Sequence, residues 1–177
     1  MNVLLISRPG LSLLRTLRES ETAWDAIRFY GPIGLTIGVY IPVSTLAGAI
    51  SLTSDLRFFI RKYTVDHLFQ LRPGVYYTAA LSRSRYLTRD LGVSEEWPYR
   101  LVYWIENGGK IRKQRAKEWN SEEVIYSSLP LEPESDEENE GISIEDRIRG
   151  RIDMTYDKIP GGYLFEVWCT KPEHEMF

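Results

Sequence analysis

Basic and aromatic side chains are interleaved in one stretch of this 177-residue sequence, a pattern that suits contact with RNA. The stretch contains Lys110, Arg112, Lys113 and Arg115, and Trp119 follows it. Clustered cations neutralise phosphates, and an aromatic ring stacks on an unpaired base. An exposed strand edge that Lys and Arg protect against pairing with another chain would show the same residues. Both interpretations stay open on these residues alone.

A second basic and aromatic cluster lies upstream, at Arg83, Arg85 and Tyr86. Guanidinium groups grip phosphates and a phenol ring stacks on a base, which is how proteins commonly recognise single-stranded RNA. The flanking serines are equally typical of a polar surface loop. RNA contact and a polar surface loop therefore both stay open for this cluster.

His67 is the one histidine in the interior of the sequence and the candidate general base. The pattern places it between Asp66 and Leu68 at the end of a helix, where capping or packing is the commoner role. His174 lies in a charged tail and is expected in solvent. We expect a non-catalytic protein, with His67 as the residue that an enzyme would use.

The cysteine and histidine content argues against a metal centre. Cys169 is the only cysteine, which excludes an internal disulfide and a cysteine-based zinc site. With only two histidines, a zinc site would need carboxylate ligands as well. We expect no cofactor, no metal and a reducing, intracellular setting.

Charge is distributed unevenly. Eight acidic residues and no basic ones lie between Glu132 and Asp146, whereas 13 basic and five acidic residues lie between Arg57 and Lys117. The basic section could face phosphates and the acidic one could not, although solvated surface charge would look the same. Residues 29–54 carry no charge but contain two prolines and four glycines, so they do not predict a membrane-spanning helix. Because the N-terminus lacks a basic start and a cleavage site, we expect a cytoplasmic protein without a signal peptide.

Periodicity predicts an α+β fold built on an antiparallel sheet, in a single domain over residues 1–177. Ser44 or Thr45 should cap a helix, and a second helix with Arg57, Arg61 and Lys62 on its outer face should follow it. The predicted strands are residues 2–7, with 11–18 as a continuation or second strand, then 74–80, 99–105, 110–113, 148–154 and 163–169. Hairpin turns are predicted at residues 106–109 and 160–162, and a mobile acidic loop at residues 129–141.

Residues 41–50 read Ile-Pro-Val-Ser-Thr-Leu-Ala-Gly-Ala-Ile. This segment resembles the Pro-x-Ser-Thr-hydrophobic-x-Gly-Ala-hydrophobic segment of the RAMP superfamily of CRISPR effector subunits. Pro42 ends the preceding strand, the hydroxyl residues cap a helix, and Gly48 allows either close packing or a close RNA backbone. The resemblance implies that the segment opens the first helix of a ferredoxin-like, RRM-type domain.

Two further segments resemble the same family and occur in the family's order. Residues 18–25 contain Arg-Glu-Ser and then Trp-Asp, similar to a stretch after the first strand of the type III-B subunit that caps the guide RNA. Residues 151–167 resemble the family's Ile-Asp-Arg-x-Thr…Gly-x-Leu-Phe pattern, which leads from a thumb-like hairpin into a strand. Met154 stands where the family usually has Arg.

By resemblance, the protein is a non-catalytic subunit that seats the 5′ handle of the crRNA and contacts the large and backbone subunits of a type III or type I complex. Two alternatives remain, a metal-independent endoribonuclease that uses His67 and a viral protein that mimics the subunit to inhibit CRISPR immunity. The residues expected to bind RNA are Arg18, Ser44, Thr45, Gly48, Arg83, Arg85, Tyr86, Lys110, Arg112, Lys113, Arg115, Arg151, Met154 and Tyr156.

Overall fold

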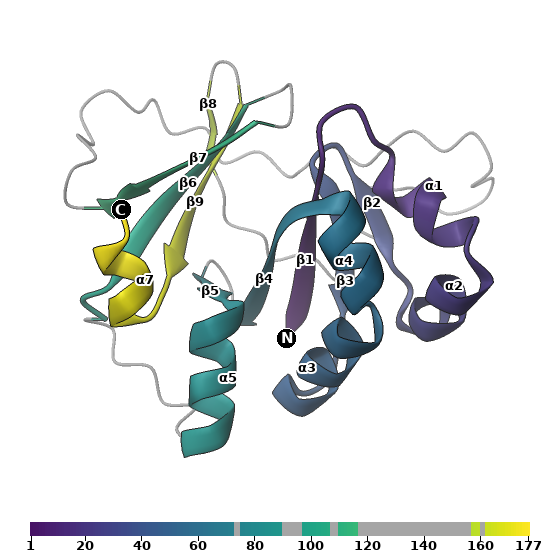
Figure 1. Ribbon diagram of the computed structural model, residues 1–177, viewed down its shortest axis with the longest axis horizontal. Coiled ribbons are helices and arrows are strands. Elements are labelled where there is room, and N and C mark those ends of the chain that lie inside the picture. Colours follow the sequence, from purple (N-terminus) through teal and green to yellow (C-terminus); the bar gives the residue numbers. More distant parts are fainter. Residues whose placement is uncertain (73–74, 90–96, 107–109, 117–156, 160–161) are drawn as a thin grey trace.

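A mixed β-sheet runs through the computed structural model, and helices cover one of its faces (Figure 1). The structure describes residues 1–72, 75–89, 97–106, 110–116, 157–159 and 162–177. The expected α+β class is confirmed.

The strand order of the sheet is β2-β3-β1-β4-β5-β9-β6-β7, and β8 pairs with β9 off this path. The strands are β1 (Asn2–Ser7), β2 (Ile33–Leu35), β3 (Gly38–Pro42), β4 (Thr64–Arg72), β5 (Val75–Thr78), β6 (Arg100–Glu106), β7 (Ile111–Arg115), β8 (Asp157–Ile159) and β9 (Gly162–Trp168). All pairs are antiparallel except β5 and β9, where Tyr76 lies opposite Val167 in a parallel ladder. The purely antiparallel sheet expected from the sequence is therefore wrong at this position.

The helices connect the strands in a regular alternation at the N-terminal end of the chain. They are α1 (Leu13–Arg18), α2 (Glu21–Ile27), the 3-10 helix η1 (Arg28–Tyr30), α3 (Leu46–Asp55), α4 (Arg57–Tyr63), α5 (Ala79–Thr88) and α7 (Lys171–Glu175). Helices α1 and α2 lead from β1 to the β2–β3 hairpin, and α3 and α4 lead from β3 to β4. The first four strands of the chain lie in the order β2-β3-β1-β4, so β1 has a neighbouring strand on each side.

Strand β1 is buried on both faces, which explains its uninterrupted apolar sequence. Val3 and Leu5 face the core under the helices, whereas Leu4 and Ile6 face a second core. The second core also contains Tyr103 of β6, although β4, β5 and β9 separate β1 from β6 in the strand order. The sheet must therefore curl so that its two halves share one core.

Several predicted elements are confirmed. The strands at residues 2–7, 99–105, 110–113 and 163–169 correspond to β1, β6, β7 and β9, and the two consecutive helices correspond to α3 and α4. Strands β6 and β7 pair antiparallel across residues 107–109, as a hairpin requires. The predicted strand at residues 148–154 and the acidic loop at residues 129–141 lie outside the described residues.

Three local interpretations differ from the structure. Residues 13–18 form α1 rather than a strand, because Leu13, Leu14 and Leu17 bury one side of a helical turn. The strand predicted at residues 74–80 is confirmed as β5, but it ends at Thr78, whose hydroxyl accepts a hydrogen bond from the amide of Leu81 and caps α5. The cluster at residues 83–86 therefore lies on a helix and not in a loop.

No helix within the described ranges is both long enough and apolar enough to cross a membrane.

Gly38 provides a test of the β1–β3 register. Its φ is 153°, and a Cβ built there would lie 1.8 Å from the carbonyl oxygen of Leu5 on the neighbouring strand. We expect Gly38→Ala to lower the free energy of unfolding by about 3 kcal/mol or more, because the contact is with backbone. Gly10→Ala, where φ is 73° and nothing lies within 4 Å, should cost only about 1 kcal/mol in the same urea titration. Equal losses would contradict the register.

Candidate nucleic-acid interface

The segment that resembles the RAMP family forms the junction between β3 and α3. Strand β3 ends at Pro42, and the hydroxyl of Thr45 accepts a hydrogen bond from the amide of Gly48 at 3.1 Å. Capping by Thr45 confirms one of the two predicted caps, and Ser44 is left exposed. The segment opens α3 after α1 and α2 have joined β1 to β2, so the expected position at the first helix is wrong.

Gly48 is packed closely by its own chain. A Cβ at this position would lie 3.2 Å from Oγ1 of Thr45 and 3.3 Å from Cγ1 of Val43. These contacts are tighter than ordinary van der Waals packing, and both neighbours are side chains. The small residue therefore serves the capped turn itself, which accounts for Gly48 without RNA.

A cleft of about 540 Å³ opens beside this junction. Its lining comes from the start of β1, the η1 turn and the end of β3, and consists of Met1, Asn2, Arg28, Phe29, Tyr30, Gly31, Pro42, Val43 and Ser44. The Phe29 side chain is 84% exposed, and the guanidinium of Arg28 lies 4.7 Å from its ring centroid. The cleft thus offers a cation, two aromatic rings and the Ser44 hydroxyl to one ligand.

The sequence-based list of site residues missed Arg28, Phe29 and Tyr30. They lie in a stretch for which periodicity predicted no element, and in the structure they form η1. The signal that could have found them is a cation followed by two aromatic residues and then by the turn residues Gly31 and Pro32.

The residues of the upstream cluster divide between the surface and the interior. Arg85 is only 9% exposed, and its guanidinium lies 4.6 Å from the ring centroid of Trp97. Arg83 and Tyr86 are exposed on α5. RNA contact at Arg83 and Tyr86 stays a prediction, while Arg85 contributes to packing.

The basic residues of the β6–β7 hairpin point in different directions. Lys110 is exposed before β7 begins. Nε of Arg112 lies 2.8 Å from Oε1 of Glu106, and its guanidinium lies 5.1 Å from the centroid of Trp104. Nε of Arg115 donates a hydrogen bond to the carbonyl oxygen of His174. Alternation along β7 therefore divides these cations between the two faces of the strand.

Lys113 belongs to a polar cluster that links distant strands. Its ammonium lies 2.6 Å from Oδ2 of Asp66 on β4, and the Tyr103 hydroxyl donates to the same oxygen at 3.1 Å. In a flat sheet, the three strand spacings from β4 to β6 would separate Asp66 from Tyr103 by about 14 Å. The contact therefore depends on the curl of the sheet. The pKa of Tyr103 is raised far above its usual range. Burial of the side chain is the largest cause, and the negative charge of Asp66 and its hydrogen bond add to the effect.

The segment around Arg18 forms the α1–α2 junction, after the first strand as the resemblance implies. The hydroxyl of Ser20 accepts a hydrogen bond from the amide of Ala23 and caps α2. The Arg18 guanidinium is exposed and lies 5.5 Å from the ring centroid of Trp24. Three expected site residues, Arg151, Met154 and Tyr156, lie outside the described residues.

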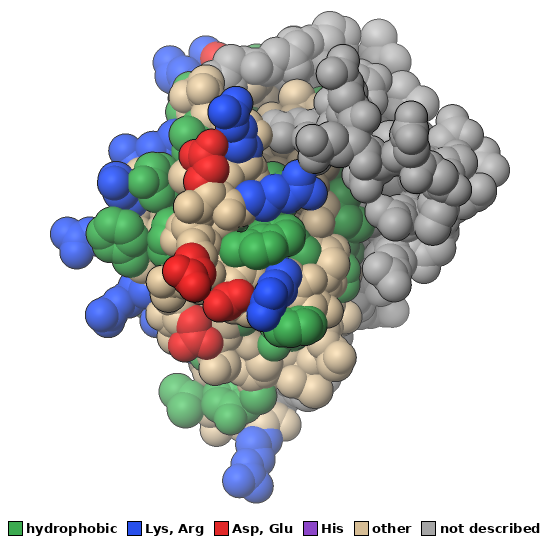
Figure 2. All heavy atoms as spheres, turned by 90° about the vertical axis from the view of Figure 1, so that its right-hand side faces the viewer, with side chains coloured by type: hydrophobic (Ala, Val, Ile, Leu, Met, Phe, Trp, Pro, Cys, Tyr) green, Lys and Arg blue, Asp and Glu red, His purple; other side chains and the backbone are tan. Residues whose placement is uncertain are grey.

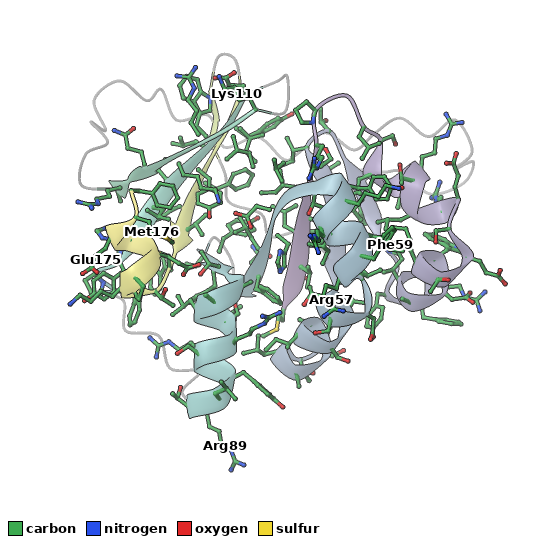
Figure 3. All side chains as sticks on the ribbon, viewed as in Figure 1. Arg57, Phe59, Arg89, Lys110, Glu175 and Met176 are labelled. Carbon is green, nitrogen blue, oxygen red and sulfur yellow. The ribbon has the colours of Figure 1, made fainter. Side chains whose placement is uncertain are left out.

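The predicted site residues do not converge on one surface. In Figure 3, Lys110 lies at one end of the molecule, where β6 and β7 meet, and Arg89 lies at the free end of α5, at the opposite end. The α3 junction with Ser44, Thr45 and Gly48 lies beside the cleft that Ser44 lines.

His67 lies within β4, so its predicted position at a helix end is wrong. Its ring lies 5.8 Å from that of Phe69, edge to face. Burial lowers the pKa of His67, the negative charge of Asp66 opposes this effect, and the positive charge of Arg83 adds to it. The imidazole is therefore a half-buried packing group, and it contacts the core rather than the cleft.

No protein family, curated protein or solved structure matches this chain. Within the described residues, no group of three or more His, Cys, Asp or Glu side chains could hold a metal ion.

The pKa shift of His67 predicts a pH dependence of stability. Because the folded state lowers this pKa below the ordinary 6.5, the unfolded chain takes up the proton more readily. The stabilisation is present above pH 6.5 and is lost as the pH falls below it. We expect the free energy of unfolding to decrease between pH 7.5 and 5.5, and His67→Gln to reduce this decrease in urea titrations. His174→Gln should retain it, and a decrease unchanged by His67→Gln would refute the assignment.

The Asp66 cluster predicts unequal effects of its members. Asp66→Ala removes the acceptor of both the buried Tyr103 hydroxyl and the Lys113 ammonium, and should cost about 3 kcal/mol of unfolding free energy. Lys113→Ala leaves the Tyr103 hydrogen bond intact and should cost about 1 kcal/mol. Arg112→Ala removes an exposed ion pair with Glu106 and should cost less than about 1 kcal/mol. Equal losses for the three variants in chemical denaturation would contradict this order.

Proposed function

We propose that this protein is a non-catalytic RNA-binding subunit of a CRISPR effector ribonucleoprotein in the cytoplasm. It seats the 5′ handle of a crRNA and contacts the large and backbone subunits. The observation that carries the proposal is the location of residues 41–50, which resemble the RAMP segment. They form a capped strand-to-helix junction at the rim of a cleft that offers a cation and aromatic rings.

The connectivity of the N-terminal strands supports a ferredoxin-like domain. Two strand–helix–strand halves and the order β2-β3-β1-β4 are the arrangement of that fold, in which a central first strand is antiparallel to both neighbours. The RAMP resemblance implies the same fold, but residues 41–50 open α3 and not the first helix of the unit. The remaining strands, from β5 onward, continue the sheet beyond this unit.

The thumb-like hairpin of the proposed fold leads into β9. Its described part is the pairing of β8 with β9, in which Ile159 lies opposite Gly162. Residues 151–156, where the sequence resembles the family, precede β8 and lie outside the described residues.

The chemistry of the cleft fits an unpaired nucleotide. Phe29 presents most of its ring to solvent and can stack on a base. Arg28 lies beside that ring, and its ion pair with Asp25 at 3.3 Å is exposed and easily exchanged for a phosphate. The Ser44 hydroxyl adds a hydrogen-bonding group to the lining.

The half-buried His67 disfavours the endoribonuclease alternative. A general base must reach the 2′-hydroxyl from which it removes a proton, within about 3 Å. His67 packs against Phe69 on β4, whereas the cleft is formed at the opposite end of β1, by Met1 and Asn2. The favoured function is therefore binding.

Binding to a repeat-derived crRNA tests the cleft directly. We expect Arg28→Ala combined with Phe29→Ala to weaken binding about tenfold or more, since one stacked base contributes about 1–3 kcal/mol. The measurement is fluorescence anisotropy at constant salt. Arg15→Ala is the matched control, because Arg15 is also exposed and ion-paired, with Glu19 on α1. Equal affinity of the double variant and the wild type would show that the cleft is not the RNA site.

Purification of the tagged protein from its native host, with sequencing of the bound RNA, tests the assembly. The expected result is co-purification of crRNA together with other effector subunits. Recovery of neither would refute the proposed function. Recovery of effector proteins by a chain that has no preference for RNA would identify it as an inhibitor that occupies the subunit's place.

A further inference from the structure

The outward face of α4 combines exposed cations with an exposed aromatic ring. Arg57, Arg61 and Lys62 are exposed, and the Phe58 side chain is 63% exposed. Phe59, Ile60 and Tyr63 pack against the core instead. One side of this short helix thus anchors it, while the other side presents three positive charges around one ring.

Other cations of the described chain are neutralised by carboxylates, but these three are not. Salt bridges to Asp or Glu shorter than 4.0 Å are formed by Arg15, Arg28, Arg100, Arg112, Lys113 and Lys171. Within the described part of the chain, Arg57, Arg61 and Lys62 form no salt bridge. Helix α4 lies on the side of the molecule that faces the viewer in Figure 1. The same side is seen along the left edge of Figure 2, where basic side chains gather beside hydrophobic ones.

The Phe58 ring is held in place although it is exposed. It packs edge to face against Phe59, with ring centroids 5.4 Å apart and an interplanar angle of 86°. The Lys62 ammonium lies 5.5 Å from the Phe58 centroid and 4.9 Å from that of Tyr63. A base stacked on Phe58 would therefore have its phosphates within reach of a cation, without a large loss of side-chain freedom on binding.

We propose that this face of α4 binds single-stranded nucleic acid, with Phe58 stacking on a base and Arg57, Arg61 and Lys62 neutralising phosphates. Alternating rings and cations are how proteins hold single strands without reading their sequence. The proposal rests on the RNA-binding role proposed above and adds a surface to it. A membrane surface fits less well, because α4 exposes one large apolar side chain, whereas interfacial helices bury a continuous apolar face.

The C-terminal end of α4 and the cleft lie at opposite ends of β1. The amide of Arg8, just after β1, donates a hydrogen bond to the carbonyl oxygen of Tyr63 at the end of α4. Met1 and Asn2, at the other end, line the cleft. A six-residue strand spans about 20 Å, so a single strand of several nucleotides is needed to reach from the cleft to the end of α4.

The test is fluorescence anisotropy with an unstructured RNA of about 30 nucleotides, longer than the site of one small binding domain. Arg57→Gln combined with Arg61→Gln should weaken binding about tenfold or more. It should also reduce the slope of log K against log salt by about 1.4, since each lost phosphate contact contributes about 0.7 for a single strand. Phe58→Leu keeps the surface apolar and should weaken binding about tenfold with an unchanged slope.

Matched controls are Arg15→Gln combined with Lys171→Gln, which removes two exposed but ion-paired cations, and Leu87→Ala, which truncates an exposed apolar side chain on α5. Both should bind RNA like the wild type, and all variants should keep the thermal unfolding midpoint of the wild type.

Each outcome separates the two proposals. Unchanged affinity and slope in both α4 variants, with loss of binding in the Arg28 and Phe29 double variant, would overturn the α4 surface alone. Loss in the α4 variants but not in the cleft variant would support the α4 surface and overturn the cleft. A wild-type protein that binds no RNA would overturn both. Release from phosphatidylserine vesicles by the α4 variants, with RNA affinity unchanged, would assign the surface to a membrane and overturn this inference.

Discussion

Burial of β1 on both faces is the constraint on which the rest of the structure depends. Val3 and Leu5 require a layer of helices, and α1 to α5 supply it. Leu4 and Ile6 require a second cover, and side chains of β6 and β9 share that core with them. A sheet can cover itself only by curling, and the Asp66–Tyr103 hydrogen bond between β4 and β6 is a direct consequence of that curl.

Local signals predicted the elements well, because they depend on neighbours along the chain. The apolar run of β1, the capped start of α3 and the glycine-rich turn between β6 and β7 were all visible in the sequence. Helix α1 was missed because six residues with three buried leucines satisfy a strand pattern as well as a helical one. The parallel pairing of Tyr76 with Val167 joins residues far apart in the sequence, and no local pattern encodes such a pair.

The candidate site shows the same division between local and tertiary information. The sequence identified a capped junction at residues 41–50, but not the cleft, because the cleft also needs η1 and the start of β1. It also identified cations without their partners. Lys113 looked available for phosphate, yet Asp66, 47 residues away in the sequence, lies within 2.6 Å of its ammonium. Arg57 and Arg61 looked like ordinary surface charge, yet among the described residues no carboxylate forms a salt bridge with either of them.

Salt bridges within the protein therefore decide which of its basic residues can attract a polyanion. Between Arg57 and Lys117 the excess of positive charge is large, but the salt bridges of Arg100, Arg112 and Lys113 reduce it on the β6–β7–β9 side. What remains is concentrated on helices, where side chains three and four residues apart share a face. The C-terminal end of α4 lies at the far end of β1 from the cleft, and β1 is buried along most of its length. A ligand that contacted both of the proposed surfaces would have to be extended, as a single-stranded RNA is.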